Sequence, residues 1–370
     1  MSAARGTNRS ATVDADRVRA LVAWFDDSAR DLPWRHGRTG YTALVSEAML
    51  QQTQVARVVD RFTAFMDRFP DVASLAAADE EDVLSLWQGL GYYRRARNLH
   101  AAARMIVDDM NGAVPRDVAA LKSLPGVGPY TAGAIASIVH DERTPIVDGN
   151  VHRVLSRWDA RSGPASDGTA MARTWQRAAE VVEHATRPGT LNEALMELGA
   201  TVCTPKRPLC EACPVRTTCK AFATGEPESI PGASAAPPRS EVHHHVVIIR
   251  RRARLLVEQR PSKGLWSNMW QPPAVEGLEA MEPAAVAEAF AERGLPLVRL
   301  AAHSTFTHET THRRVGFNVY TATTRMRRGE WADAHRLKTL PMSAAHRRAI
   351  ETMYVAMNEA RRRVPAKMTD

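Results

Sequence analysis

The chain has 370 residues, of which 44% are hydrophobic and 24% are charged, so it is long enough for two globular domains of ordinary size. Its first residues lack the apolar core of a signal peptide, and no segment approaches the roughly 20 apolar residues of a membrane span, which predicts a cytoplasmic protein. The net charge of +8 favours a polyanionic partner, although an arginine-rich composition can also follow from a GC-rich genome.

Helical patterning dominates the first part of the chain. Residues 1–12 are polar and are expected to be disordered, whereas apolar residues recur three or four positions apart over residues 13–222. The repeat is clear at Val18, Leu21, Val22 and Phe25. Residues 223–241 are rich in Pro, Gly, Ala and Ser, which is typical of a linker. The sequence therefore predicts an all-α domain followed by a linker.

The pattern changes after the linker. Alternating or continuous apolar runs predict strands, and two amphipathic segments predict helices; the strands are expected at 246–250, 254–258 and 315–320, and the helices at 283–293 and 344–357. The histidines at 243–245 would alternate between the faces of a strand and cannot all bind one ion, so they are predicted to begin an ordinary strand. We expect a smaller α+β domain over 242–358 and a basic tail over 359–370.

A glycine-containing turn joins two predicted helices at residues 124–133. Gly126 and Gly128 permit a tight turn that leaves backbone N–H groups exposed at the start of the next helix, an arrangement that binds phosphate. An ordinary helix–helix turn is the alternative interpretation. The flanking residues favour a helix–hairpin–helix that binds the DNA backbone.

Two acidic residues are candidates for catalysis. Glu47 lies in an apolar helical segment, where desolvation would raise its pKa and suit it to act as a general acid. Asp148 precedes a predicted helix, so it is a candidate for a helix cap, for a catalytic carboxylate, or for both. For Glu47 the alternative is a side chain that reaches the helix surface.

All four cysteines lie within residues 203–219. They are Cys203, Cys210, Cys213 and Cys219. Four thiolates so close in sequence favour a [4Fe–4S] cluster. A structural zinc ion is the main alternative, although zinc sites usually show two separated Cys-x2-Cys pairs, and two disulfides are the other alternative.

These motifs together resemble the helix–hairpin–helix DNA glycosylases, and within that superfamily the MutY-type adenine DNA glycosylases. The segments that carry the resemblance are residues 32–35, 46–55, 88–99, 124–133, 147–151, 192–199 and 203–219. The resemblance implies a multi-domain fold: an all-α helix–hairpin–helix glycosylase domain with a [4Fe–4S] loop, and a smaller α+β Nudix-like domain.

The resemblance also implies an activity. The chain would remove adenine mispaired with 8-oxoguanine or guanine from duplex DNA and leave an abasic site. Glu47 would protonate N7 of adenine and later activate water, and Asp148 would stabilise the positive charge on the sugar. Tyr130 and Asn150 would position the sugar, the aspartate and the water. Tyr130 stands where relatives that resemble endonuclease III carry a Schiff-base lysine, which implies a monofunctional enzyme.

The substrate contacts implied by the resemblance span both domains. Arg35 and Glu193 would bind adenine, while Gln52 and Tyr92 would fill the space left by the flipped base. The implied substrate-binding residues are Arg35, Glu193, Gln52, Thr53, Leu90, Tyr92, Gly126, Gly128, Phe306, Thr307 and His308. The partner would be double-stranded DNA, the protein would be a monomer, and in a bacterium it would associate with the nucleoid.

The second domain resembles the lesion-recognition domain of the same family, which has the Nudix hydrolase fold. Residues 277–294 lack the Arg-Glu-x-x-Glu-Glu core with which Nudix enzymes bind metal, so recognition is expected in place of hydrolysis. Residues 303–308 match the loop of the family that reads 8-oxoguanine, with Thr307 in place of the usual serine. Two alternatives are a glycosylase for other damaged or mismatched bases and a non-catalytic iron–sulfur DNA-binding protein.

Overall fold

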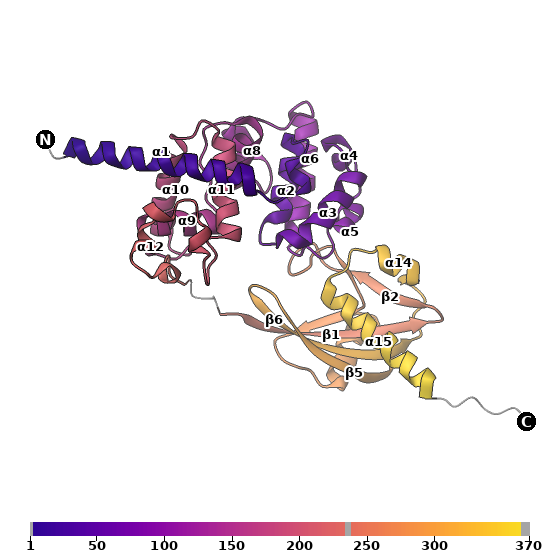
Figure 1. The fold of residues 1–370 in the computed structure, drawn as a ribbon. Helices are drawn as coiled ribbons and strands as arrows, with labels where there is room; N and C mark the ends of the chain where they lie inside the picture. The colour runs from indigo at the N-terminus through magenta and orange to yellow at the C-terminus, as the bar shows by residue number, and fades with distance from the viewer. Residues whose placement is uncertain (1–2, 234–237, 364–370) are drawn as a thin grey trace, which may run out of the picture. The chain divides into compact units, whose positions relative to one another are not determined.

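The computed structural model describes residues 3–233 and 238–363, which form two compact units (Figure 1). Residues 1–78 and 94–235 make up the helical unit, and residues 79–93 and 236–370 make up the sheet unit. The sequence predicted one boundary within the 223–241 linker. The short segment 79–93 instead groups with the C-terminal residues, because for example Ser85 donates a hydrogen bond to the carbonyl of Thr339 at 2.9 Å.

The helical unit confirms the predicted all-α domain. Its helices are α1 (Ala3–Ser28), α2 (Gly40–Leu50), α3 (Val55–Arg68), α4 (Val72–Ala76), α6 (Arg94–Asp109), α7 (Val118–Ser123), α8 (Pro129–His140), α9 (Gly149–Asp159), α10 (Gly168–Val182), α11 (Pro188–Thr201) and α12 (Lys220–Ala223). Helix α1 begins at Ala3, whereas disorder was expected up to residue 12. Five of residues 3–12 are Ala or Arg, strong helix formers that let the helix continue backward from its packed end, whereas the Gly, Ser, Thr and Asn among them are weaker helix formers.

Local sequence explains where the helices around the site begin. Thr39 and Thr42 form a capping box at the start of α2, and the side chain of Asp148 accepts a hydrogen bond from the Val151 amide at the start of α9. Helix α8 opens with Pro129 at its first turn, where a missing N–H costs nothing. Helices α8 and α9 pack against α11, α2 packs against α8, and one apolar core joins α1, α9, α10 and α11.

The sheet unit contains a seven-stranded mixed sheet with strand order β3-β2-β1-β6-β5, to which β4 adds beside β1 and β7 beside β2. Its elements are α5 (Glu80–Leu86), β1 (Ser240–Arg251), β2 (Arg254–Gln259), β3 (Trp270–Gln271), β4 (Ala274–Gly277), α13 (Pro283–Glu292), β5 (Leu297–Glu309), β6 (Arg313–Thr324), β7 (Glu330–Ala332), α14 (Ala334–Thr339) and α15 (Ala344–Arg363). Strands β1 and β6 are parallel, and β5 and β6 are antiparallel. The α+β prediction is confirmed.

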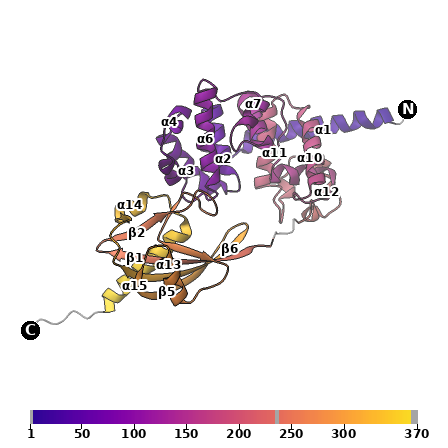
Figure 2. The same cartoon turned by 180° about the vertical axis from the view of Figure 1, so that it is seen from behind.

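Strand β1 is buried on both faces, which explains its continuous apolar run (Figure 2). Val246 and Ile248 belong to a core that includes residues of α15, whereas Val247 and Ile249 belong to a second core with Val286 and Phe290 of α13. The histidines at 243–245 lie in β1 as expected. The rings of His243 and His245 stack with centroids 6.5 Å apart, whereas His244 faces the first core.

Three boundaries differ from the expectation. Residues 306–308, expected in a loop, lie within strand β5, where Phe306 pairs with Phe317 and Thr307 with Gly316. Helix α15 continues to Arg363, beyond the expected start of the tail at 359, and residues 364–370 lie outside the described part of the chain. Within the predicted linker, Pro227–Ser229 form a short 3-10 helix, and β1 begins at Ser240.

Candidate active site

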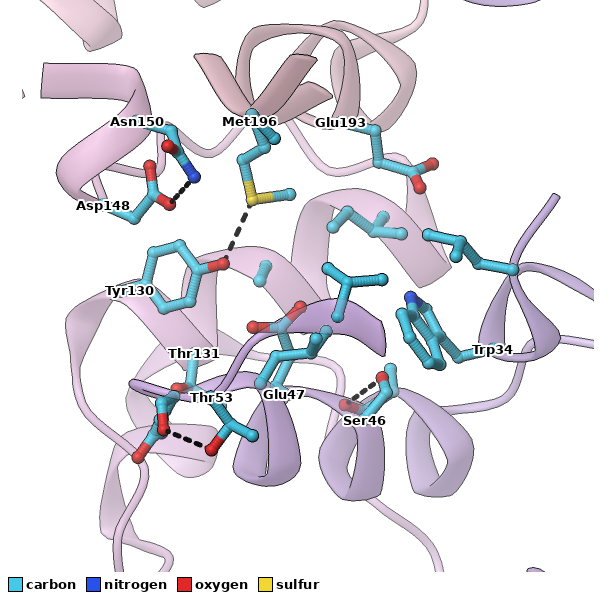
Figure 3. A pocket seen from close by; sticks show the side chains of 18 of the residues that line it. Trp34, Ser46, Glu47, Thr53, Tyr130, Thr131, Asp148, Asn150, Glu193 and Met196 are labelled. Atoms are coloured by element: carbon cyan, nitrogen blue, oxygen red, sulfur yellow. Dashed lines mark hydrogen bonds between the residues drawn. The ribbon is translucent and has the colours of Figure 1, made fainter. Parts of the chain in front are cut away.

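A cavity of about 700 Å³ opens in the helical unit between the ends of α2, α8, α9 and α11 (Figure 3). Both proposed catalytic acids line it, together with the two residues proposed to position the sugar: Glu47, Tyr130, Asp148 and Asn150. Residues separated by about 100 positions in the sequence therefore face one space. This arrangement is what base excision requires, because a flipped base must enter a pocket that holds its catalytic groups.

Glu47 lies on the cavity side of α2 and is only 8% exposed. Burial raises its pKa to about 7, and the nearby carboxylates of Asp148 and Glu193 act in the same direction. A hydrogen bond from Tyr130 and the charge of Arg38 partly oppose the rise. A carboxyl group with a pKa near neutrality is protonated in a substantial fraction of molecules, so Glu47 can donate a proton at physiological pH.

Asp148 is both a helix cap and a cavity residue. Its side chain accepts a hydrogen bond from the Val151 amide at 2.7 Å and another from Nδ2 of Asn150 at 3.0 Å. Burial raises the pKa of Asp148, while these two hydrogen bonds and the charge of Arg153 oppose the rise. The two carboxyl groups thus have different surroundings, since only Asp148 accepts backbone N–H donation that favours its ionised form.

Tyr130 stands in the first turn of α8, between the two acids. Its hydroxyl lies 3.1 Å from Sδ of Met196 and also faces the carboxyl group of Glu47, so its one proton can be donated to either acceptor. Burial followed by the charge of Glu47 raises the pKa of the hydroxyl well above its usual value. The phenol therefore stays protonated and can only act as a neutral hydrogen-bonding group. The described residues that line the cavity include no lysine.

Arginine and glutamate side chains that form ion pairs with one another line one side of the cavity. Arg35 and Arg38 both bind Glu193, at 3.2 and 2.5 Å. Arg35 also binds Glu197 at 3.0 Å, and Arg30 binds Glu197 at 2.6 Å. Glu197 is buried, yet hydrogen bonding from Arg30 and the charge of Arg35 hold its pKa below the usual value. The wall offers guanidinium donors and carboxylate acceptors, which suits a planar, hydrogen-bonding base.

Several cavity residues were missed by the sequence analysis. They are Arg30, Trp34, Arg38, Met196 and Glu197. The arginines and Glu197 could have been found from one feature of the sequence. Glu193 and Glu197 are four residues apart, so they lie on the same face of α11. Acidic side chains on a mostly buried helix face need cationic partners, and three arginines cluster at residues 30–38.

In the helix–hairpin–helix turn, Gly126 needs the freedom of glycine, whereas Gly128 has an extended φ of −94° and open space around its Cβ position. Gly126 has φ +79°, and a Cβ atom built on it would lie 2.7 Å from Cβ of Asn98. Gly128 caps α8. Both glycines line the cavity, as do Gln52 and Thr53. Gln52 has φ +57°, a strained value that points to a constrained role.

Two predicted substrate contacts are not part of this cavity. Leu90 is buried, and Tyr92 is 44% exposed with φ +46°. Both belong to segment 79–93, which groups with the sheet unit. Their proposed role as wedges stays a prediction.

The four cysteines meet around a second, smaller cavity. Cys203, Cys210, Cys213 and Cys219 all line it, next to Arg157 and Trp158. Burial raises the pKa of Cys213 to about 12, and the neighbouring thiols add to the rise. Among the described residues, no group of three or more His, Cys, Asp or Glu side chains is placed to hold one metal ion. Four thiols that line one cavity are the ligand set that a four-thiolate metal group requires.

Arg157 of α9 donates hydrogen bonds to several groups of the cysteine loop. It is 2% exposed, and its guanidinium donates to Sγ of Cys203 at 3.3 Å and to the carbonyl of Thr204 at 2.8 Å. The carbonyl of Pro205 accepts a further hydrogen bond at 3.1 Å. A buried cation beside the thiols is suited to a group that carries net negative charge.

The segment proposed to read the lesion lies in the sheet unit, in β5. The ring of Phe306 stacks on Phe317 with centroids 4.8 Å apart, and the guanidinium of Arg348 lies 4.2 Å from the Phe306 centroid. Burial and then the charge of Arg348 lower the pKa of His308, while Thr307 is exposed. Phe306, Thr307 and His308 thus form one short strand segment with an aromatic, a hydroxyl and a neutral imidazole group.

Comparison with known proteins gives the family of the chain. Residues 45–180 match the HhH-GPD superfamily base excision DNA repair protein model, and residues 244–352 match the NUDIX domain model. Within the described residues, no helix has the length and apolar character needed to cross a membrane.

Three curated relatives are adenine DNA glycosylases. The protein from Mus musculus is 38% identical over 81% of this chain and 69% of its own length, and that from Homo sapiens is 37% identical over 81% and 66%. The protein from Mycolicibacterium smegmatis is 45% identical over 53% and 66%. A solved structure of a thermostable thymine-DNA glycosylase is 26% identical, with a TM-score of 0.52 over 59% of this chain and 99% of its own. From the identity to the mouse protein across most of both chains, and from the two domain matches, this chain belongs to the adenine DNA glycosylase family of base excision DNA repair proteins.

Proposed function

We propose that the protein removes adenine from A:8-oxoguanine and A:G pairs in duplex DNA by hydrolysis of the N-glycosidic bond. The observation that carries the proposal is the pairing of two unlike carboxyl groups in one cavity. Glu47 is buried with a pKa of about 7, and Asp148 is held by N–H donors. One group can donate a proton while the other offers negative charge.

The reaction follows from these positions. Adenine is a poor leaving group, so protonation of N7 by Glu47 weakens the bond between the base and the sugar. As that bond breaks, positive charge develops on the sugar, and Asp148 stabilises it. Glu47, now ionised, then takes a proton from the attacking water. Arg35 and Glu193 supply the donor and acceptor groups that would hold the base in the cavity.

The absence of a nucleophilic amine supports a monofunctional enzyme. Strand cleavage by a lyase requires an amine that forms a Schiff base with the sugar. Tyr130 occupies the hairpin position nearest Glu47, and the described lining holds no lysine. The product would be an abasic site in an intact strand.

The cysteine cavity would hold a [4Fe–4S] cluster through Cys203, Cys210, Cys213 and Cys219. When bound, the cluster would supply a fixed, negatively charged centre that orders the loop. Purified protein should contain about four irons per chain and absorb broadly in the visible range. Colourless protein with stoichiometric zinc from an iron-replete, anaerobic preparation would contradict this part of the proposal.

The sheet unit would read the lesion opposite adenine. 8-oxoguanine differs from guanine by a carbonyl at C8 and an N–H at N7. The hydroxyl of the exposed Thr307 can hydrogen-bond to these groups, whereas His308, the next residue of β5, faces the opposite side of the strand beside Trp266. The NUDIX match carries no hydrolytic role here, since residues 277–294 lack the Arg-Glu-x-x-Glu-Glu core. We expect the enzyme to act as a cytoplasmic monomer.

One assay tests the activity. The protein is incubated with 30-bp duplexes that carry A:8-oxoguanine, A:G, A:T or T:G, and alkali then cleaves any abasic sites. Strand breaks that need alkali should form with the first two duplexes, and the Glu47→Gln protein should form none. Breaks with T:G alone would instead support a glycosylase for mismatched thymine.

A further inference from the structure

One end of the sheet unit gathers arginines from two turns that are far apart in the sequence. Strand β1 turns into β2 through residues 252–253, and β6 leads into β7 through residues 325–329. These turns lie at the same end of the sheet, because Ile249 of β1 pairs with Ala322 of parallel β6. We define the arginine end as Arg250, Arg251, Arg252, Arg254, Arg325, Arg327 and Arg328, all of which are exposed.

The arginine end has a large excess of positive charge. Its two turns and strand β7, residues 250–254 and 325–333, contain seven arginines and two acids, Glu330 and Asp333, which leaves an excess of five charges. Asp333 is already engaged, because its side chain accepts the amide of Arg336 at 2.9 Å as the cap of α14. The charge of Asp333 also acts on Arg254, but two carboxylates leave most of the charge of seven arginines uncompensated.

The backbone places some of these charges directly against each other. Arg251 and Arg254 are paired residues across the β1–β2 hairpin, and like charges in such a pair repel each other. Arg252 has φ +55° at the first position of the two-residue turn, where glycine or asparagine is preferred. The turn carries an arginine at a position that disfavours it, and an anion held between these guanidinium groups would offset their repulsion.

The arginine end is distant from the segment proposed to read the lesion. Phe306 pairs with Phe317 on β6, and β6 then continues for seven residues to Thr324. At about 3.4 Å per residue the separation is about 24 Å along the strand, so the two sites lie toward opposite ends of β6. A duplex that crosses the sheet at Phe306–His308 would leave the arginine end accessible, whereas one that runs along β6 would cover both sites, and the second experiment below distinguishes these arrangements.

We propose that the arginine end binds the phosphate backbone of a second DNA segment while the first duplex is held at the lesion-reading segment. Guanidinium groups match phosphate oxygens in two-point geometry, and an excess of cationic charge binds duplex DNA regardless of sequence. Contact with two segments would allow direct transfer between them during a search. The role of the first duplex rests on the proposed function, whereas DNA binding by the arginine end does not.

The first experiment measures affinity for an undamaged 30-bp duplex by anisotropy at several salt concentrations, using the full chain. The variant Arg252→Asn/Arg327→Gln/Arg328→Gln removes three charges, so its log–log salt slope should be shallower by about 2 to 3. The control Ala280→Glu/Ala284→Glu/Ala291→Glu lowers net charge by the same amount at exposed positions in and beside α13 and should keep the wild-type slope. Equal slopes for the arginine variant and wild type, with both folded by thermal melting, would overturn the proposal.

The second experiment distinguishes a second segment from the lesion duplex itself. A 15-bp A:8-oxoguanine duplex is fixed to beads, loaded with protein, and offered a labelled undamaged duplex. Wild type and the alanine-to-glutamate control should retain the label, and the arginine variant should lose most of it. Loss of protein from the beads with the arginine variant alone would show that these arginines hold the lesion duplex, which would overturn the two-segment arrangement. Failure of all proteins to load would count against the proposed function, and the salt slopes would still decide DNA binding by the arginine end.

Discussion

Nε of Arg153 donates a hydrogen bond to the main-chain carbonyl of Cys203 at 2.7 Å. Nη2 of the same guanidinium donates to Oδ1 of Asn150 at 2.8 Å, and Asn150 in turn donates to Asp148 at 3.0 Å. A continuous chain of hydrogen bonds therefore connects the first cysteine of the loop to the proposed catalytic aspartate. Asn150 and Arg153 lie in α9 and Asp148 is its N-cap, so the position of this one helix fixes both ends of the hydrogen-bonded chain.

Arg153→Gln should weaken both ends of this connection. The substitution leaves the carbonyls of Cys203 and Gly199 without their donor, at a cost of about 1–3 kcal/mol for each buried group that stays unsatisfied. We expect a lower thermal midpoint and a slower single-turnover release of adenine. Arg104→Gln is the matched control, since Arg104 is exposed and bonds carbonyls at the end of α4 and just beyond it. If the two variants had the same thermal midpoint and the same single-turnover rate, the hydrogen bonds of Arg153 would have no role in catalysis.

Base removal should depend on the protonation of Glu47. Burial raises the pKa of this group to about 7, so the acid form is lost as pH rises through 7. The single-turnover rate should fall about tenfold per pH unit above that value. Glu47→Gln keeps the shape without a transferable proton and should be inactive at every pH while still binding the duplex. A rate that stays constant from pH 6 to 9 would exclude Glu47 as the acid.

The same pKa has a consequence for stability that serves as a control on folding. A carboxyl group whose pKa is raised from 4.5 to about 7 by burial favours the folded state only while it is protonated. Ionisation of the buried group lowers the free energy of unfolding as the pH rises from 4.5 to 7. Above pH 7 the loss is complete, at about 3 kcal/mol. Glu47→Gln should therefore unfold at a higher temperature than wild type at pH 8, with a smaller difference at pH 5.

Asp148→Asn separates catalysis from helix capping. Asparagine caps a helix about as well as aspartate, so the thermal midpoint should change little. The neutral amide cannot offset positive charge on the sugar, and the single-turnover rate should fall by more than tenfold, which corresponds to about 1.4 kcal/mol in activation free energy. A smaller decrease in rate would mean that the cap is the main role of Asp148.

The sequence predicted most of the site because its residues lie in compact motifs. Glu47 and Asp148 could be singled out one by one, since an acid in an apolar helix and an acid before a helix are each visible locally. The arginine wall was missed because Arg30 and Glu197 are 167 positions apart, and only tertiary packing brings them together. Phe306–His308 were placed in a loop because the family resemblance implied one, whereas pairing with β6 extends β5 through them.

Tyr130→Lys should add lyase activity. The substitution places an amine in the first turn of α8, beside Glu47 and the sugar site. The amine can form a Schiff base with the abasic sugar, which borohydride reduces to a covalent protein–DNA adduct. Wild type and the control Tyr130→Phe should give little adduct on a denaturing gel. Strong trapping by Tyr130→Phe would show that a different amine reaches the sugar and would contradict the monofunctional interpretation.

Thr307→Val should reduce the preference for 8-oxoguanine over guanine opposite adenine. Valine has nearly the shape of threonine but lacks the hydroxyl, so the pairing of Thr307 with Gly316 on β6 can persist while one polar contact is lost. A good contact to a base edge contributes about 1–3 kcal/mol of discrimination, so the ratio of single-turnover rates on A:8-oxoguanine and A:G duplexes should fall about tenfold. Thr305→Val is the matched control, because Thr305 is exposed, lies two residues earlier in β5 and points to the same face. The comparison needs the full chain, since residues 79–93 group with the sheet unit and lie inside the glycosylase sequence. If Thr307→Val kept the wild-type ratio, or if Thr305→Val lowered it equally, the hydroxyl of Thr307 would have no role in lesion recognition.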